Sequence, residues 1–220
     1  MMPRLRRAGD RALLLETGDP AGTIAVAAAL AAASLDEVEE LVPAAATVLV
    51  RVARGADLTA LGRRVLAAAD GATAVGGTTG GAHAGPGATA PDELVIPVVY
   101  DGPDLAEVAA STGLTAAEVI AAHAGTPWQA AFVGFAPGFA YLIGGDPRLQ
   151  VARHSQSRPR VPAGSVALAG EYSAVYPRES PGGWQLIGRT TATLWDETAE
   201  PAAAIRPGRQ VRFQDAGARP

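Results

Sequence analysis

The chain has 220 residues, enough for one large domain or two small ones, and its 48% hydrophobic and 18% charged content is typical of a soluble globular protein. Its formal net charge of −4 argues against a nucleic-acid or anionic-membrane partner. The chain contains neither cysteine nor lysine, which excludes disulfides, thiolate metal ligands, a cysteine nucleophile and a catalytic lysine.

The first 70 residues predict a small α+β domain. The apolar run ALLLE follows a turn at residues 8–10, which indicates a strand hairpin. Alanine-rich sequence then favours a helix that ends before Pro43. The expected elements, in chain order, are a hairpin over Leu5–Glu16, a helix over Gly22–Val42, a strand over Thr47–Ala53 and a helix over Leu58–Ala69. This order predicts an α/β sandwich of the β-β-α-β-α kind.

A break in composition separates this domain from the rest. Residues 71–91 are rich in glycine and nearly devoid of large apolar side chains, so they cannot build a core. We expect a flexible linker or a long exposed loop there, with His83 solvated inside it.

Residues 92–220 form the second predicted domain. Glu93–Tyr100 is expected to be a strand, and Pro97 indicates an edge or a bulge. Two helices should follow, one capped by Asp104 and the next opened by a Thr115–Glu118 capping box. Their expected bounds are 104–111 and 115–123. Short strands joined by tight turns come next, and the final strand is expected over Gln210–Gln214.

No standard catalytic motif is present. The chain has no G-x-S-x-G elbow, phosphate-binding P-loop or HExxH zinc motif, and no helical pattern follows its glycine-rich segments as a dinucleotide site requires. No metal-ligand set is recognisable, and no His–Asp pair is recognisable near Ser165. These absences disfavour an independent enzyme of a common class.

The candidate site residues lie mainly between Phe132 and Asp196, where glycine, proline, aromatics and arginine gather. Tyr141 either lines a shallow pocket or packs in the core, and its hydroxyl needs a partner in both cases. Arg153, Arg158 and Arg160 form a basic cluster with His154. Guanidinium groups bind carboxylate or phosphate with two parallel hydrogen bonds, so the cluster is either an anion site or a solvated loop.

Three further candidates have equally simple structural alternatives. Ser165 can contact a ligand or satisfy its own turn. Gln185 and Arg189 share one face of a predicted strand, where they can read an amide or carboxylate or merely face water. His123 ends a helix, where the helix dipole alone can explain it, or it acts as a base or an orienting group.

Several motifs in fixed order carry a resemblance to a known family. They read GF-x-PGF-x-YL from residue 134, PR-x-VPAGSVA from residue 159, YP-x-ESPGGWQLIGRT from residue 176 and a closing LWD. The chain resembles the carboxyltransferase-domain family, which contains the B-type component of 5-oxoprolinase, the kinase inhibitor KipI and allophanate hydrolase subunit 1. Two positions depart from the family pattern: Ala152 replaces a proline, and residues 171–174 replace a Gln-Thr-Gly run.

The resemblance implies an α+β fold with a C-terminal cyclophilin-like β-barrel. It also implies a cytoplasmic heteromer with two partners. One is a homologous component of the KipA or allophanate hydrolase subunit 2 type, and the other is a component of the YcsF/LamB type. Such a complex opens 5-oxo-L-proline to L-glutamate with ATP, and the isolated chain is expected to be inactive.

On this reading, His123, Arg160 and Arg189 are the expected catalytic residues. Arg153, Ser165, Gln185 and Tyr141 are expected to bind the substrate, and no metal is expected. The alternatives are inhibition of a sensor histidine kinase, as KipI does, and a role in an allophanate hydrolase or urea amidolyase.

Overall fold

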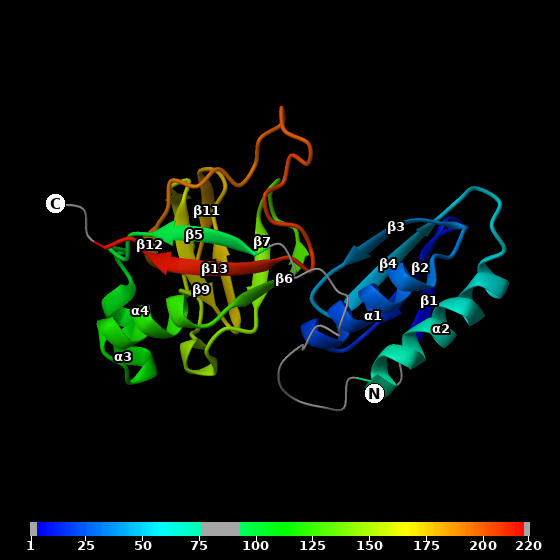
Figure 1. The fold of residues 1–220 in the computed structure, drawn as a ribbon, viewed down its shortest axis with the longest axis horizontal. Helices are drawn as coiled ribbons and strands as arrows, with labels where there is room; N and C mark the ends of the chain where they lie inside the picture. Colours follow the sequence, from blue (N-terminus) through cyan, green and yellow to red (C-terminus); the bar gives the residue numbers. More distant parts are fainter. Residues whose placement is uncertain (1–3, 76–92, 218–220) are drawn as a thin grey trace. The chain divides into compact units, whose positions relative to one another are not determined.

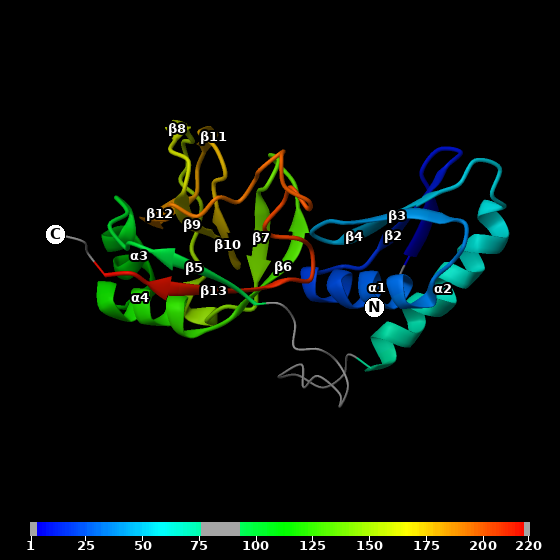
Figure 2. The ribbon, with the colours of Figure 1, turned by 45° about the horizontal axis from the view of Figure 1, so that its top comes forward.

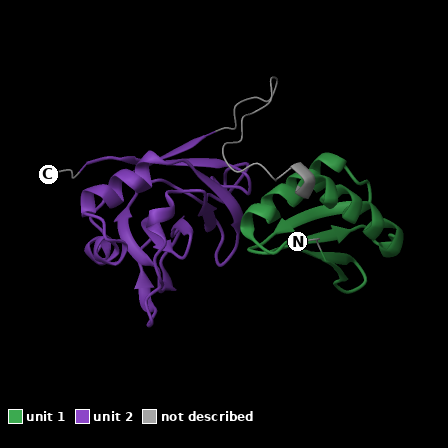
Figure 3. Ribbon diagram, turned by 90° about the horizontal axis from the view of Figure 1, so that it is seen from below, with its two compact units in different colours: residues 1–88 green, residues 89–220 purple. Residues whose placement is uncertain are grey.

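The computed structural model of the chain describes residues 4–75 and 93–217. The chain forms two compact units, unit 1 (residues 1–88) and unit 2 (residues 89–220), which Figure 3 shows in different colours. Each unit encloses a hydrophobic core of its own.

Unit 1 is a four-stranded antiparallel sheet with two helices (Figure 1). α1 packs on β3 and β4, α2 contacts β1 and β2, and the two helices contact each other. Leu13, Leu15, Val48 and Val50 fill the space between sheet and helices. The sheet order is β1-β2-β4-β3, and the bounds are β1 (Arg4–Arg7), β2 (Ala12–Glu16), α1 (Pro20–Ala33), β3 (Val38–Pro43), β4 (Thr47–Val52) and α2 (Leu58–Val75).

The helix expected over Gly22–Val42 is wrong in its second half, where the chain forms β3. Ser34 adopts a left-handed backbone with φ 44°, which ends α1. The strand then pairs with β4, but its register shifts between Val38 and Glu40. A bulge of this kind breaks the alternation of apolar and polar residues by which a strand is recognised in sequence. The order of elements is therefore β-β-α-β-β-α.

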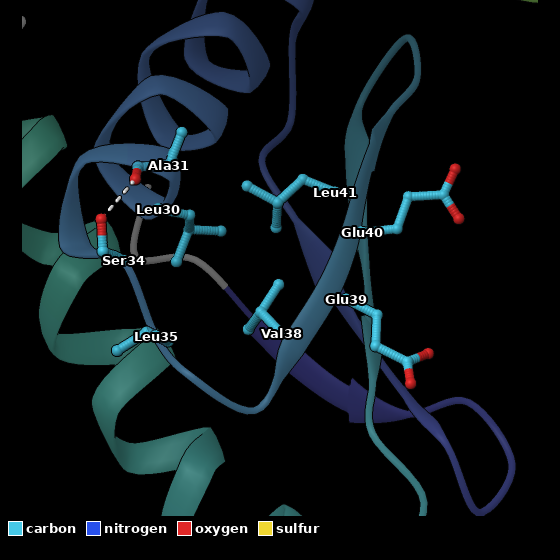
Figure 4. Close-up of a pocket in the computed structure, with 8 residues that line it drawn as sticks. All are labelled: Leu30, Ala31, Ser34, Leu35, Val38, Glu39, Glu40 and Leu41. Atoms are coloured by element: carbon cyan, nitrogen blue, oxygen red, sulfur yellow. Dashed lines mark hydrogen bonds between the residues drawn. The ribbon is translucent and has the colours of Figure 1, made fainter.

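Figure 4 shows what the bulge does to the side chains. Val38 and Leu41 face Leu30 across a cavity of about 270 Å³, whereas Glu39 and Glu40 both point away from it. On that outer side Glu39 pairs with Arg11 at 2.9 Å and Glu40 with Arg51 at 2.6 Å. These pairs are about half exposed, so they stabilise unit 1 only slightly.

The helix α2 is longer than expected, because it continues through Asp70 to Val75 instead of ending at Ala69. The first residues of the expected linker are thus helical. Residues 76–92, with His83, lie outside the described part of the chain.

Unit 2 is built on a seven-stranded sheet (Figures 1 and 2). Its order is β12-β9-β10-β7-β6-β13-β5, parallel between β13 and β5 and antiparallel elsewhere. A separate pair, β8 (Arg158–Val161) and β11 (Ser180–Gly182), forms a short ribbon. The bounds in the large sheet are β5 (Leu94–Val98), β6 (Trp128–Val133), β7 (Ala140–Ile143), β9 (Ser165–Ala169), β10 (Tyr172–Val175), β12 (Gln185–Arg189) and β13 (Gln210–Asp215).

The two edges of this sheet meet. Val99, directly after β5, exchanges two backbone hydrogen bonds of 2.9 Å with Arg189 at the end of β12. Gly188 permits this approach, because a Cβ there would lie 2.6 Å from the Val99 carbonyl oxygen. The sheet is therefore a nearly closed barrel, and the predicted α+β class with a C-terminal barrel is confirmed. Pro97 lies on the edge strand β5, as expected.

Two helices, α3 (Leu105–Thr112) and α4 (Ala116–Gly125), pack beside the barrel. The predicted capping box of α4 is present, since Thr115 and Glu118 each bond the other's backbone N–H. The predicted cap of α3 is wrong, because the Asp104 carboxylate makes no bond to that helix. Within residues 4–75 and 93–217, no single helix is long and apolar enough to span a membrane; α3 and α4 reach that length only together, across a 91° bend.

Candidate functional site

A pocket of about 270 Å³ opens on unit 2, which we call the aromatic pocket. The turn after β6, the segment before β8 and the turn between β11 and β12 meet around it. It is lined by Phe135, Phe139, Tyr141, Arg153, Ser157, Tyr176, Pro181, Gly182 and Trp184.

The aromatic rings of this pocket hold one another edge to face. The Phe139 ring centroid lies 5.1 Å from that of Tyr141, 5.3 Å from Tyr176 and 5.6 Å from Trp184, all nearly perpendicular. Such contacts add about 0.5–1.5 kcal/mol per pair beyond burial. The wall is therefore rigid and presents ring faces and edges to a ligand.

Arg153 supplies the positive charge of the aromatic pocket. Its side chain is exposed, and no carboxylate among the described residues forms an ion pair with it. Burial raises the pKa of Tyr141 and of Tyr176, and the Arg153 charge offsets part of that rise. Both phenols therefore stay protonated at neutral pH and can donate hydrogen bonds. The site offers a cation, two hydroxyl donors and an apolar wall.

Two consecutive glycines shape this part of the pocket. A Cβ at Gly182 would lie 2.2 Å from the Tyr176 hydroxyl oxygen, so any side chain there would displace that ring. A Cβ at Gly183 would lie 3.5 Å from Nη2 of Arg153 and 3.1 Å from the Ser157 hydroxyl. The Pro-Gly-Gly-Trp sequence thus lets the phenol and the guanidinium lie against bare backbone.

Phe135 stands at the pocket mouth in an unusual backbone conformation. Its φ is 68°, and its side chain is 59% exposed while it contacts Phe139 and Tyr176 edge-on. A left-handed aromatic residue costs on the order of 1 kcal/mol or more, and such strain gathers at ligand sites. The same residue borders an apolar groove of about 370 Å³ with Val133 and Trp195.

The structure brings two of the seven predicted site residues, Tyr141 and Arg153, into the aromatic pocket. Gln185 follows Trp184 directly but lies outside the pocket lining, with its Nε2 3.2 Å from the Ala152 carbonyl oxygen. Ser165 satisfies its own turn, donating to the Pro162 carbonyl oxygen at 2.8 Å.

Arg160 and Arg189 face solvent. The Arg160 side chain is 81% exposed and lies 3.9 Å from Glu179, and Arg189 pairs with Asp101 at 2.8 Å. The backbone of Arg189, not its guanidinium, has the clear structural task, because it closes the barrel. Sequence spacing could not separate Arg153 from Arg160.

His123 is fully buried in the core of unit 2, where nothing in the described chain gives a ligand access to it. Its ring stacks on Phe213 at 4.3 Å, and its nitrogens are 2.8 Å from the hydroxyls of Tyr100 and Ser173. Burial lowers its pKa to about 3, so the ring is neutral and the helix-dipole explanation fails too. A direct proton-transfer role finds no support.

Sequence reasoning missed a polar cluster around Asp104. The Asp104 carboxylate accepts hydrogen bonds from Arg158 at 2.6 Å and from the Leu186 N–H at 2.7 Å, and Nε2 of His154 lies 3.3 Å away. Burial raises the pKa of Asp104, but these hydrogen bonds lower it further, so the net pKa lies below the usual value. Asp104, Glu107 and His154 bring potential metal-ligand atoms within 4.8 Å of one another. Their separation of about 50 residues hid this set.

Comparison with known proteins settles the family. The model of the carboxyltransferase domain, subdomains C and D, matches residues 3–205. The chain belongs to this family. The resemblance inferred from the motifs is thus confirmed.

Relatives of the carboxyltransferase chain carry two kinds of name. It is 46% identical over 123 residues to the B-type component of 5-oxoprolinase from Escherichia coli O157:H7, covering 54% of this chain and 56% of that one. The matched region spans about half the length of the curated proteins of this name. The crystal structure of TTHA0988 superposes with a TM-score of 0.72 and 32% identity over 95% of this chain and 40% of that one.

The urea amidolyase of Kluyveromyces lactis has the same fold. It superposes with a TM-score of 0.66 at 16% identity, covering 98% of this chain and 15% of that protein. At this identity the likeness concerns the fold alone.

Proposed function

We propose that this chain is the B-type component of an ATP-dependent 5-oxoprolinase complex, and that its aromatic pocket receives 5-oxo-L-proline. The observation that carries the proposal is Arg153, a guanidinium without a carboxylate partner in the described chain, beside a wall of aromatic rings. The substrate is a small flat lactam ring that bears one carboxylate. Arg153 would bind the carboxylate with two hydrogen bonds, and the rings would cover the lactam.

The proposed reaction opens an unreactive amide. ATP would activate the lactam carbonyl by phosphorylation, and water would complete the hydrolysis to L-glutamate. The residues of this chain would bind and orient the ring, with Tyr141 or Tyr176 as a hydrogen-bond donor to a substrate oxygen. Among the described residues, no histidine or carboxylate bonds the Ser157 hydroxyl to activate it as a nucleophile, which supports a site completed by another protein of the complex.

The described residues do not fit ATP itself. Phosphates bind well at free helix N-termini, yet each of the four described α-helices begins with an acidic cap or first-turn residue. The residues concerned are Asp19, Asp57, Glu107 and Glu118. We therefore assign ATP to the rest of the complex, which would comprise a homologous component of the KipA type and a component of the YcsF/LamB type.

Reconstitution tests this proposal. The chain, co-purified with its two partners, should convert 5-oxoproline to glutamate with ATP, whereas the chain alone should not. A stable three-component complex that consumes no 5-oxoproline would contradict the proposal. Release of ammonia from allophanate by that complex would instead support the urea amidolyase alternative, which the shared fold keeps in view.

One observation favours a second candidate, the inhibition of a sensor histidine kinase. Val133, Phe135 and Trp195 expose apolar surface around a groove of about 370 Å³, as a helix-binding inhibitor would require. Co-expression with histidine kinases, scored by loss of autophosphorylation, tests it. Unchanged autophosphorylation at saturating chain would exclude this role.

A further inference from the structure

The second polar cluster of unit 2 lies where α3 begins, beside Gln185 of β12 and the segment before β8. Asp104 is 4% exposed, His154 is half-buried and Glu107 is exposed at the rim. Each offers one ligand atom, and these atoms lie within 4.8 Å of one another. None of the three lines the aromatic pocket, and the proposed reaction does not use them.

The spacing within this cluster suits a bound ion better than a hydrogen bond. Nε2 of His154 lies 3.3 Å from Oδ2 of Asp104 and yet makes no hydrogen bond in the structure. Metal–ligand bonds of about 2.1 Å in tetrahedral geometry place two ligand atoms about 3.4 Å apart. The two atoms are thus already separated as two ligands of one ion would be.

An independent observation comes from Gln185. Its side chain is 94% buried, because only 6% of its surface is exposed, and its Oε1 has no hydrogen-bond partner among the described residues. The amide reaches the cluster, since Nε2 lies 3.5 Å from Oε1 of Glu107 and 3.2 Å from the Ala152 carbonyl oxygen. Those two contacts fix which end of the amide is the donor. A buried carbonyl oxygen left without a donor costs free energy unless a ligand satisfies it.

Charge also favours a cation here. Asp104 and Glu107 carry two negative charges and Arg158 one positive charge, which leaves −2 + 1 = −1 with His154 neutral. Arg158 and the Leu186 N–H each occupy one oxygen of Asp104, and a carboxylate has room for further partners on both oxygens. The two donors hold the carboxylate in place, as outer partners do around metal ligands.

We propose that Asp104, Glu107 and His154, with Oε1 of Gln185 as a fourth oxygen donor, bind one divalent transition-metal ion. An imidazole nitrogen with oxygen donors suits Zn²⁺, Co²⁺ or Mn²⁺ better than Ca²⁺ or Mg²⁺. The ion would also fix the segment that carries Arg153, because His154 follows Arg153 directly and its N–H donates to the Gly183 carbonyl oxygen at 2.8 Å. The site is independent of the proposed activity.

Titration of the full-length, untagged, metal-stripped chain with CoCl₂ tests this site. The visible absorption of bound Co²⁺ should saturate at one ion per chain, and ZnCl₂ should displace it. Glu107→Gln and His154→Ala should each weaken Co²⁺ binding at least about tenfold. Both residues are outside the buried core, so circular dichroism should show an unchanged fold.

Two matched controls keep the result specific. Glu179→Gln removes an exposed carboxylate elsewhere on unit 2, and His83→Ala removes a histidine outside the described residues; neither should change the Co²⁺ affinity. Absence of saturable binding would overturn the site and leave an ordinary His154–Asp104 ion pair. Binding that survives unchanged in both cluster variants would overturn it equally.

Discussion

Burial decides what the titratable side chains of this chain can do. Arg153 and Arg160 look alike in sequence, but only Arg153 lines a pocket, while Arg160 projects into solvent. His123 and His154 differ in the opposite sense, since the candidate chosen from sequence is in the core and the neglected one meets a carboxylate. Residue type and spacing predicted the chemistry available, but only the fold places each group.

His123 should make stability depend on pH in a defined direction. Its folded pKa of about 3 lies below the ordinary value of 6.5, so the unfolded chain binds the proton more tightly. The contribution is complete above pH 6.5 and is lost as the pH falls toward 3, by about 1.4 kcal/mol per pH unit. Urea unfolding should therefore give a destabilisation by His123→Gln that is about 2 kcal/mol smaller at pH 5 than at pH 7.5. An equal difference at both values would contradict the buried neutral ring.

At the scale of elements, the chain is predictable where local signals agree with tertiary pairing. The hairpin β1–β2, the edge strand β5, the capping box of α4 and the final strand β13 all follow from period and turn chemistry. The strand β3 does not, because its bulge removes the alternation and its alanine-rich neighbour extends a helical pattern. Barrel closure is invisible locally, since Val99 and Arg189 are far apart in sequence.

Gly188 should be required for that closure. Gly188→Ala would place a Cβ 2.6 Å from the Val99 carbonyl oxygen and force the two edges apart. We expect a loss of about 3 kcal/mol in the free energy of unfolding, measured by chemical denaturation.

The matched control is Gly71→Ala, in α2, where a Cβ would meet nothing within 4 Å. It should stabilise the chain by about 0.5–1 kcal/mol through helix propensity. A Gly188→Ala variant as stable as the parent would show that the edges do not meet closely.

At the scale of the whole molecule, the aromatic pocket and the Asp104 cluster both belong to unit 2, and each unit has its own core. The family motifs predicted this unit well, because glycine and proline at its turns are specific signals. They could not predict the cluster, whose members come from α3, the segment before β8 and β12. Those contacts arise only once the barrel has closed.

Unit 2 should therefore fold without unit 1. A fragment of residues 89–220 should show a cooperative thermal transition and a near-ultraviolet dichroism signal from its packed aromatic rings. A fragment that lacks both signals would mean that the two cores depend on each other.

The central claim is that Arg153 binds the substrate carboxylate. Its most direct test is the 5-oxoproline dependence of the reconstituted complex with Arg153→Ala, compared with Arg160→Ala, a matched arginine outside the pocket. Loss of a charge-assisted pair of hydrogen bonds worth about 2–3 kcal/mol should lower kcat/KM by about 30- to 150-fold for Arg153→Ala, mainly through KM, and leave Arg160→Ala near the parent. Equal kinetics for Arg153→Ala and the parent, in a complex that assembles normally, would contradict the account.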